Sequence, residues 1–226
     1  MQTSLIRGAA ALLLAFAGSA HAVSYGSNLI VNGNAESGSA GWTAYAGTPL
    51  FAAVEYSGDW VKPTEPGPAD RGGFLFVGGS GVDYAAGFQT VDVSANAADI
   101  AKGNVGYSLS GWLGGWTSQA DNAYLYVSFL DAASNVLGNA ELASVTPADR
   151  GNLTGLLYRE ASGLVPVGTT KISFDLSMQR LVSGDNDGYA DNLAFTLAPV
   201  PEPQSYALMA LGLLTLGAVL RRRRQN

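Results

Sequence analysis

Residues 124–129 read Tyr-Leu-Tyr-Val-Ser-Phe, and residues 172–177 read Ile-Ser-Phe-Asp-Leu-Ser. In both stretches a large apolar residue occupies every second position, and Tyr, Ser or Asp residues stand between them. The side chains of an extended strand point alternately to its two faces. Each stretch is therefore predicted to be a β-strand with one buried face and one exposed face.

The same strand pattern continues along the chain. Alternation also marks residues 107–113 and 192–197. Further strand candidates are residues 28–31, 50–56, 73–77, 87–93, 136–142 and 155–162. Turn-forming pairs such as Asn32-Gly33 and Asp187-Gly188 stand between candidates. So many short strands, with no convincing helix, predict an all-β protein whose two sheets pack as a β-sandwich.

The composition excludes several classes of function. The chain has no Cys, and its single His is His21, inside a predicted leader. The mature protein then has neither thiol nor imidazole for a hydrolytic triad or a zinc site. No Ser stands in a Gly-x-Ser-x-Gly motif, and no spacing selects a pair of carboxylates for glycoside hydrolysis. We therefore expect a protein that is not an enzyme, and we assign no catalytic residue.

The first 22 residues have the order of a secretory signal peptide. Arg7 precedes a small, apolar run at residues 8–19, and Ala20-His21-Ala22 follows it. A charge, an apolar run and a small-x-small triplet in this order direct export and cleavage. We expect signal peptidase to cut between Ala22 and Val23, so that the mature chain begins at Val23.

The C-terminus combines an apolar run with a block of arginines. Residues 205–220 carry no charge, and Arg221, Arg222, Arg223 and Arg224 follow directly. As a helix the run would measure about 24 Å at ~1.5 Å per residue, a little less than the ~30 Å hydrocarbon core. Arginines stay on the cytoplasmic side of a membrane, which places the body on the other side. A buried core helix would gain nothing from four consecutive arginines, so a transmembrane sorting helix is predicted.

The tail resembles a known sorting signal. Pro201-Glu202-Pro203, the apolar run and the arginine block resemble the PEP-CTERM segment of Gram-negative bacteria. The resemblance implies processing by an exosortase near Pro-Glu-Pro, in species that make exopolysaccharide and biofilm matrix. It also implies that the protein is exported, anchored transiently in the inner membrane, and then released to the cell surface or extracellular matrix. The expected organisation is a signal peptide at 1–22, a body at 23–199 and a sorting segment at 200–226.

The body between these ends is acidic. Without Glu202 the 18 acidic residues become 17, and without Arg7 and the four terminal arginines the 12 basic residues become 7, which leaves a charge of about −10. Such a domain has no basic surface for nucleic acid, so nucleic acid is not an expected partner.

Both ends of the body resemble the jelly-roll carbohydrate-binding modules. Residues 28–36, Asn-Leu-Ile-Val-Asn-Gly-Asn-Ala-Glu, followed by Gly41-Trp42, resemble their opening strand, although Ala35 stands where an aromatic residue is usual. Residues 187–195 resemble their closing strand. The resemblance implies a jelly-roll sandwich of the galactose-binding-like type. The fold alone does not imply sugar binding, because it serves many roles.

The same resemblance implies a structural calcium ion. In this family the opening Glu and the closing Asp often share Ca²⁺, and here these residues are Glu36 and Asp191. Carboxylate oxygens are the ligands that Ca²⁺ prefers. Residues 185–188 are a weaker second candidate, because the twelfth position of an EF-hand loop begun at Ser183 is Ala194 and not Glu. The alternative is that these Asp and Asn residues only bond to their own backbone in turns.

Four tryptophans are candidates for stacking on sugar rings. We assign Trp60 and Trp116 as ligand-binding residues, because Trp60 stands in a loop beside Asp59 and Trp116 follows a predicted strand. Burial in the core remains an alternative for both. Trp42 and Trp112 are expected to pack in the core.

The sequence is compatible with two functions. The first is an exported surface or matrix protein whose sandwich binds glycan or exopolysaccharide without catalysis. The alternative is a structural or adhesive biofilm-matrix protein with no discrete ligand site.

Overall fold

A computed structural model describes residues 22–57 and 59–200 of the chain. Within this part, strands dominate, and the helical elements are a 3-10 turn and one turn of α-helix. The elements in chain order are β1 (Thr43–Ala44), β2 (Ala52–Glu55), β3 (Phe74–Gly79), β4 (Tyr84–Asp92), η1 (Ser94–Asn96), α1 (Ala97–Ile100), β5 (Val105–Gly115), β6 (Asn122–Leu130), β7 (Val136–Leu142), β8 (Gly155–Leu164), β9 (Lys171–Gln179) and β10 (Asn186–Pro199).

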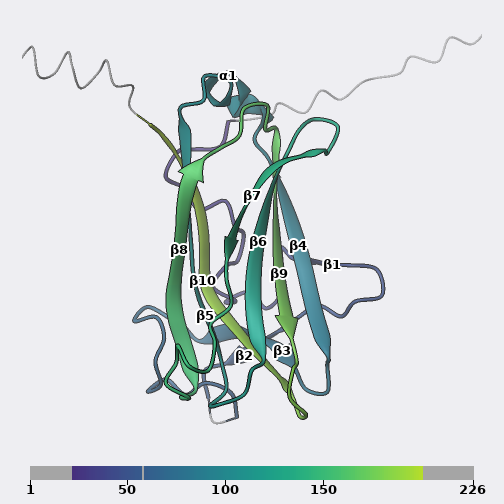
Figure 1. Cartoon of the computed structure of the whole chain (residues 1–226), viewed down its shortest axis with the longest axis vertical. Helices are drawn as coiled ribbons and strands as arrows, with labels where there is room; N and C mark the ends of the chain where they lie inside the picture. Colours follow the sequence, from purple (N-terminus) through teal and green to yellow (C-terminus); the bar gives the residue numbers. More distant parts are fainter. Residues whose placement is uncertain (1–21, 58, 201–226) are drawn as a thin grey trace, which may run out of the picture.

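The strands form two antiparallel sheets that pack face to face (Figure 1). The first sheet has the order β1-β4-β9-β6-β7, and the second has the order β2-β3-β10-β5-β8. Non-consecutive strands lie side by side in both sheets, as when β10 pairs with both β3 and β5. The all-β prediction is confirmed, and the two antiparallel sheets are consistent with a jelly-roll sandwich.

The alternating positions of the sequence form the core between the sheets. The inward side chains of β6 and β9 are fully or almost fully buried: Ala123, Leu125, Val127, Phe129, Ile172, Phe174, Leu176 and Met178. They meet β10 of the opposite sheet, where the ring of Phe195 lies 5.1 Å from that of Phe174. Full burial of one such side chain stabilises the fold by about 1.5–3 kcal/mol.

Both ends of the described chain lie at the α1 end of the sandwich (Figure 1). The backbone N–H of Val23 donates to Asn96 Oδ1 at 2.9 Å, and Asn96 Nδ2 donates to the Val23 carbonyl at 3.2 Å. At the other terminus the Val200 N–H donates to the Asn104 carbonyl at 2.6 Å. Hydrogen bonds therefore hold the backbone at both ends of the described chain.

The predicted export and sorting segments fall mostly outside the described residues. Residues 1–21 and 201–226 belong to this undescribed part. Cleavage before Val23 and the transmembrane helix at 205–220 therefore stay predictions. In the part of the chain that the structure describes, no helix is both long enough and apolar enough to cross a bilayer.

The strand predicted at residues 28–31 does not form. Asn28 is the reason, because its side chain takes over part of the pairing with β10. Asn28 Oδ1 accepts hydrogen bonds from the N–H groups of Ile30 at 3.0 Å and Phe195 at 2.9 Å, and its Nδ2 donates to the Leu193 carbonyl at 3.0 Å. The segment still lies against β10, but through a mixture of side-chain and backbone bonds.

The turn predicted at Asp187-Gly188 is also wrong. Both residues lie inside β10 and are buried. Gly188 is needed there for close packing, because a Cβ atom at this position would come within 2.3 Å of the Asn122 carbonyl oxygen. Glycine inside a strand often marks such a close approach of two backbones.

Candidate functional site

The outer face of the first sheet carries a group of aromatic side chains around a shallow depression of about 480 Å³. We call this surface the tyrosine face and define it by Tyr45, Tyr84, Tyr124, Tyr126 and Asp175. Tyr45 and Tyr84 are 42% and 43% exposed, and Tyr124 and Tyr126 are half-buried. The depression is open to solvent and presents rings to it.

The strand register explains why these side chains gather. Tyr126 of β6 stands opposite Asp175 of β9, which stands opposite Phe88 of β4. Because the side-chain period of a strand is two, the residues between core positions all point to this outer face. The rings of Tyr124 and Tyr126 are 6.3 Å apart and inclined by only 20°. They lie on the β6 side of Asp175, and Tyr45, whose ring is 4.8 Å from that of Phe88 on β4, lies on the other side.

Asp175 is the charged group of the depression. Burial raises the pKa of its carboxyl group to about 6. The hydroxyl group of Ser173 donates to Asp175 Oδ2 at 3.1 Å. The group therefore changes charge close to neutral pH, and it can accept a hydrogen bond from a ligand hydroxyl when ionised.

Neighbouring side chains of β7 hold the two β6 tyrosines. The Tyr124 hydroxyl donates to Glu141 Oε2, and Asn139 Nδ2 donates to the Tyr126 hydroxyl at 2.8 Å. Burial, together with the bond to Glu141, raises the pKa of Tyr124 to about 12. Rings restrained in this way lose little side-chain entropy on binding.

Trp60 and Trp116 lie elsewhere, on the outer side of the second sheet. Residues 59–73 cover part of that face and enclose a second apolar cluster, formed by Tyr56, Val61, Leu75, Val77, Leu156 and Tyr189. Both tryptophans are half-buried and pack against this cluster, and the ring of Trp60 lies edge-on to Tyr189 at 6.2 Å. The structure therefore separates them from the tyrosine face, and their role in ligand binding stays a prediction.

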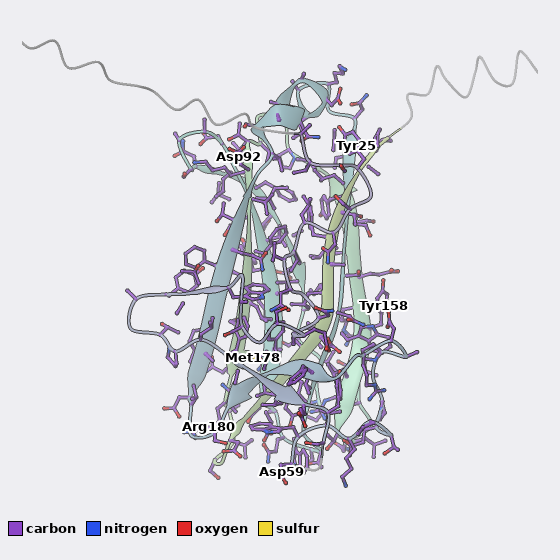
Figure 2. The ribbon with its side chains drawn as sticks, turned by 180° about the vertical axis from the view of Figure 1, so that it is seen from behind. Tyr25, Asp59, Asp92, Tyr158, Met178 and Arg180 are labelled. Atoms are coloured by element: carbon purple, nitrogen blue, oxygen red, sulfur yellow. The ribbon has the colours of Figure 1, made fainter. Side chains whose placement is uncertain are left out.

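The other two tryptophans divide between the core and the surface. Trp42 is buried in the core, 5.3 Å from Phe51, as predicted. Trp112 is not a core residue. It points outward from β5, half-buried, with its ring 5.7 Å from that of the exposed Tyr158, which Figure 2 places on the flank of the sandwich. The residue alternates with buried Gly111 and Leu113, so strand periodicity could have placed it on the outer face.

Glu36 and Asp191 come near enough for their charges to interact. Asp191 is fully buried and accepts hydrogen bonds from the Tyr56 hydroxyl at 2.6 Å and the Asn192 N–H at 2.7 Å. Burial raises the pKa of Asp191 to about 7, and the negative charges of Glu36 and Asp70 add to the effect. A cation would relieve this repulsion.

Hydrogen-bond donors already serve the two predicted calcium ligands. Glu36 Oε1 accepts from the N–H groups of Gly73 at 2.8 Å and Phe74 at 3.0 Å. Among residues 22–57 and 59–200, no group of three or more acidic, His or Cys side chains is arranged to hold a metal ion. Calcium at Glu36 and Asp191 therefore has electrostatic support but an incomplete ligand set, and it stays a prediction.

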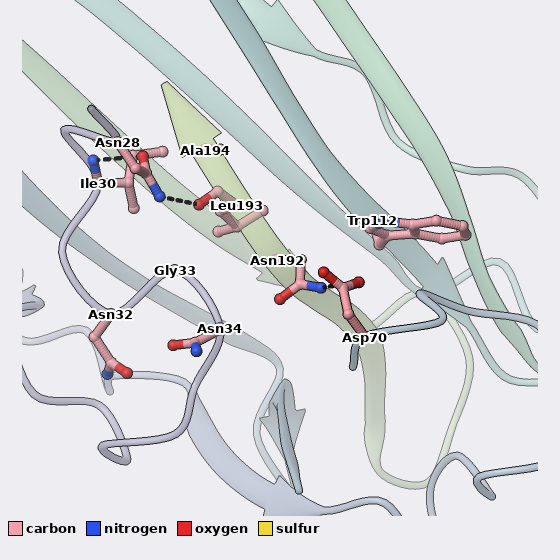
Figure 3. Close-up of a pocket in the computed structure, with 10 residues that line it drawn as sticks. All are labelled: Asn28, Ile30, Asn32, Gly33, Asn34, Asp70, Trp112, Asn192, Leu193 and Ala194. Carbon is pink, nitrogen blue, oxygen red and sulfur yellow. Dashed lines mark hydrogen bonds between the residues drawn. The ribbon is translucent and has the colours of Figure 1, made fainter. Parts of the chain in front are cut away.

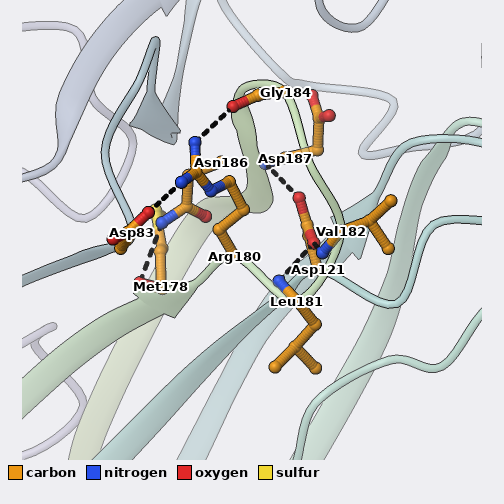
Figure 4. A network of polar contacts seen from close by, with 9 residues as sticks. All are labelled: Asp83, Asp121, Met178, Arg180, Leu181, Val182, Gly184, Asn186 and Asp187. Atoms are coloured by element: carbon orange, nitrogen blue, oxygen red, sulfur yellow. Dashed lines mark hydrogen bonds and ion pairs between the residues drawn. The ribbon is translucent and has the colours of Figure 1, made fainter.

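Residues 185–188, the weaker calcium candidate, are held by protein groups at the start of β10 (Figure 4). The buried carboxylate of Asp121 accepts from the N–H groups of Leu181 at 2.6 Å, Val182 at 2.9 Å and Asp187 at 3.2 Å. The Tyr189 hydroxyl donates to Asp187 Oδ1 at 2.6 Å. Asp121 thus organises the connection between β9 and β10 through backbone donors.

The comparisons with known proteins identify a sorting motif at the C-terminal end of the chain. Residues 199–224 match the PEP-CTERM protein-sorting motif. The chain carries an export-sorting signal. This motif implies export and membrane-anchored sorting in bacteria. No curated protein matches the sequence.

The solved structures that this chain resembles include carbohydrate-binding modules. The structure of a "Family 16 Carbohydrate Binding Module-2" is 22% identical and covers 75% of this chain and 99% of its own, with a TM-score of 0.50. The CBM22-1–GH10 modules of Clostridium thermocellum xylanase 10B, complexed with xylohexaose, are 15% identical over 75% of this chain and 27% of theirs, with a TM-score of 0.43. The C-terminal family 22 module of the same xylanase is 11% identical and covers 79% of this chain and 97% of its own, with a TM-score of 0.43. The likeness to the family 16 module shows a shared β-sandwich fold.

Sequence reasoning missed the tyrosine face. In the sequence, Tyr124 and Tyr126 were used only to predict a strand, and Asp175 was one of many acidic residues. The signal was present in the outward positions of residues 124–128, which are more aromatic than a solvated strand face requires. What the sequence lacked was the pairing of β6, β9 and β4, which brings these positions into one surface.

Proposed function

We propose that this protein is an exported, exosortase-sorted bacterial protein whose β-sandwich binds glycan or exopolysaccharide non-catalytically at the tyrosine face. The observation that carries the proposal is the pair of aromatic flanks around Asp175 in one open depression. Sugar rings stack their C–H faces on aromatic rings, and their hydroxyl groups bond to carboxylates. The similarity to a carbohydrate-binding module supports the same function.

Binding without hydrolysis is favoured by the number of carboxylates in the depression. A glycosidase of the common type needs two of them on either side of the scissile bond. Among the described residues that line the depression, Asp175 is the only carboxylate. Asp175 therefore suits the role of a hydrogen-bonding group at the floor of the site.

The test compares two substitutions of one ring. Tyr126→Ala removes the ring, whereas Tyr126→Phe removes only the hydroxyl that accepts from Asn139. Loss of a stacking contact costs about 0.5–1.5 kcal/mol, which lowers affinity by up to roughly tenfold. Retention of the protein on the purified exopolysaccharide of its host, with calorimetric titration, is expected to fall for Tyr126→Ala and to persist for Tyr126→Phe.

Failure of this test would favour the alternative function. If the unchanged protein is not retained on any host polysaccharide, a structural or adhesive role in the biofilm matrix, without a discrete ligand site, fits better. The proposal would also fail if retention were the same in both Tyr126 variants and the unchanged protein.

The proposed function also includes export and sorting of the chain, and a bound calcium ion. Signal peptidase and exosortase are the proposed processing partners, and the C-terminal helix anchors the chain transiently in the inner membrane. The proposed destination is the cell surface or extracellular matrix of a Gram-negative bacterium. A structural Ca²⁺ held by Glu36 and Asp191 is the proposed cofactor.

A further inference from the structure

The second sheet carries a separate depression on its outer side, of about 490 Å³ (Figure 3). It lies between the N-terminal segment and β10, with Trp112 of β5 at one side. The lining residues are Asn28, Ile30, Asn32, Gly33, Asn34, Asp70, Trp112, Asn192, Leu193 and Ala194. We call this the asparagine pocket. It shares no lining residue with the tyrosine face.

One wall of the pocket depends on the close approach of the backbones at Gly33 and Leu193. The Leu193 N–H donates to the Gly33 carbonyl at 2.9 Å. A Cβ atom on Gly33 would lie 2.1 Å from the Leu193 carbonyl oxygen, so only glycine fits. The N-terminal segment is thereby fastened to β10, and the pocket has a rigid wall.

Asn192 occupies a backbone conformation that L-residues seldom adopt. Its φ angle is 48°, and it lies in the β-bulge where the register of β10 against β5 shifts between Asp191 and Ala194. Bulges redirect a side chain, and backbone strain of this kind is concentrated at functional sites. Here Asn192 lines the pocket, and its Nδ2 donates to Asp70 Oδ1 at 3.1 Å.

Some polar groups of the pocket are used in bonds within the protein, and others can still bond to a ligand. The side chains of Asn28 and Asn32 hold the N-terminal segment together through several hydrogen bonds each. Asn192 Oδ1 and the second oxygen of Asp70 are acceptors beyond the bond that joins these two residues. The exposed amide of Asn34 adds both a donor and an acceptor.

Trp112 supplies an apolar surface beside these polar groups. Its ring is half-buried, lines the pocket and makes an edge-type contact with the ring of Tyr158 at 5.7 Å. An indole face next to amide and carboxylate groups suits a molecule with one apolar face and many hydroxyl groups.

The charge around the pocket selects against anions. Asp70 lines it, and the lining residues given above include no cationic side chain. We infer that the asparagine pocket is a second ligand site, for one neutral sugar residue, on the sheet opposite the tyrosine face.

The test follows the indole N–H signal of Trp112 by NMR, assigned with Trp112→Phe, in the purified full-length protein. The probes are xylohexaose, cellohexaose and mannohexaose at about 10 mM, well above a dissociation constant of ~1 mM. We expect at least one probe to shift this signal in a saturable way, and an oligogalacturonate of equal length to leave it in place. No shift with any of the three neutral probes, or a stronger effect of the oligogalacturonate, would overturn the inference.

Two variants separate this site from its surroundings. Asn192→Gly keeps the positive φ angle and removes the amide, so it is expected to fold and to weaken binding about tenfold. Asn152→Gly is the matched control, because Asn152 also has a positive φ angle, 59°, but does not line the pocket. Equal affinities in these two variants would contradict the assignment.

Tyr126→Ala distinguishes the two sites from each other. If the Trp112 signal still shifts in this variant, the asparagine pocket binds by itself, whatever happens at the tyrosine face. If the shift disappears in Tyr126→Ala and survives in Asn192→Gly, the sugar binds at the tyrosine face and the second site does not exist. Failure at the tyrosine face alone would leave this inference standing.

Discussion

Replacing Asp191 by Asn should remove a pH dependence of stability from this protein. Asp191 is fully buried, and its pKa is raised to about 7. A carboxyl group whose folded pKa exceeds its unfolded value, about 3.9, stabilises the folded state most when protonated. That contribution is complete below the unfolded pKa and is lost as the pH rises through the folded pKa. Asparagine is never ionised, and it can still accept from the Asn192 N–H and donate to the Tyr56 hydroxyl.

The size of the stability loss follows from the difference between the folded and the unfolded pKa of Asp191. One proton contributes about 1.4 kcal/mol per pH unit, so a pKa shift from ~3.9 to ~7 lowers the free energy of unfolding by about 2 kcal/mol between pH 5 and pH 7. The loss should level off above about pH 8, where Asp191 is ionised in both the folded and the unfolded state.

The assay is urea unfolding of the unchanged protein and Asp191→Asn at several pH values, in the presence of chelator. The difference between the two free energies cancels the other titrating groups. Asp59→Asn, a change at an exposed loop carboxylate, is the control and should follow the unchanged protein. A difference that stays constant from pH 5 to pH 8, or that changes in favour of the unchanged protein, would refute the argument.

Four other outcomes are expected. Ca²⁺ should raise the melting temperature, because binding only the folded state stabilises it by about 2.7 kcal/mol at a hundredfold excess over Kd; a chelator should reverse the rise and Asp191→Ala abolish it, and an unchanged midpoint would remove the metal assignment. N-terminal sequencing of the exported protein should begin at Val23, and a start at Met1 would contradict the signal peptide. Neutral replacements of residues 221–224 should impair membrane retention and exosortase processing, whereas normal yield and size would argue against this reading of the tail. Glycan binding at the tyrosine face should weaken below about pH 6, where Asp175 gains a proton and its charge-assisted hydrogen bonds are lost; Asp175→Asn should show no such pH dependence, and an equal dependence in both proteins would implicate another group.

Local patterns determined the fold class and the sorting signal. The alternation of apolar and polar residues at 124–129 and 172–177 indicates which side chains face the core, because the side chains of a strand repeat with a period of two. The tail motif is contiguous in sequence, so it needs no tertiary contact to be recognised. Where long-range contacts replaced local ones, sequence reasoning failed: the Asn28 side chain displaced a predicted strand, and Gly188 entered β10 because of the Asn122 backbone.

The candidate sites were decided by tertiary structure. Alternation fixed that Tyr126 and Asp175 each lie on the outer side of a strand, but only the pairing of β6 with β9 made them neighbours. Trp112 and Asn192 likewise line one pocket because β5 pairs with β10 around a bulge, and Asp70 bonds to Asn192 from a loop far away in the chain. A sequence determines which face a strand residue occupies, since that depends on adjacent residues. Which strands share a sheet depends on the packing of the whole chain, and that packing assembled both pockets.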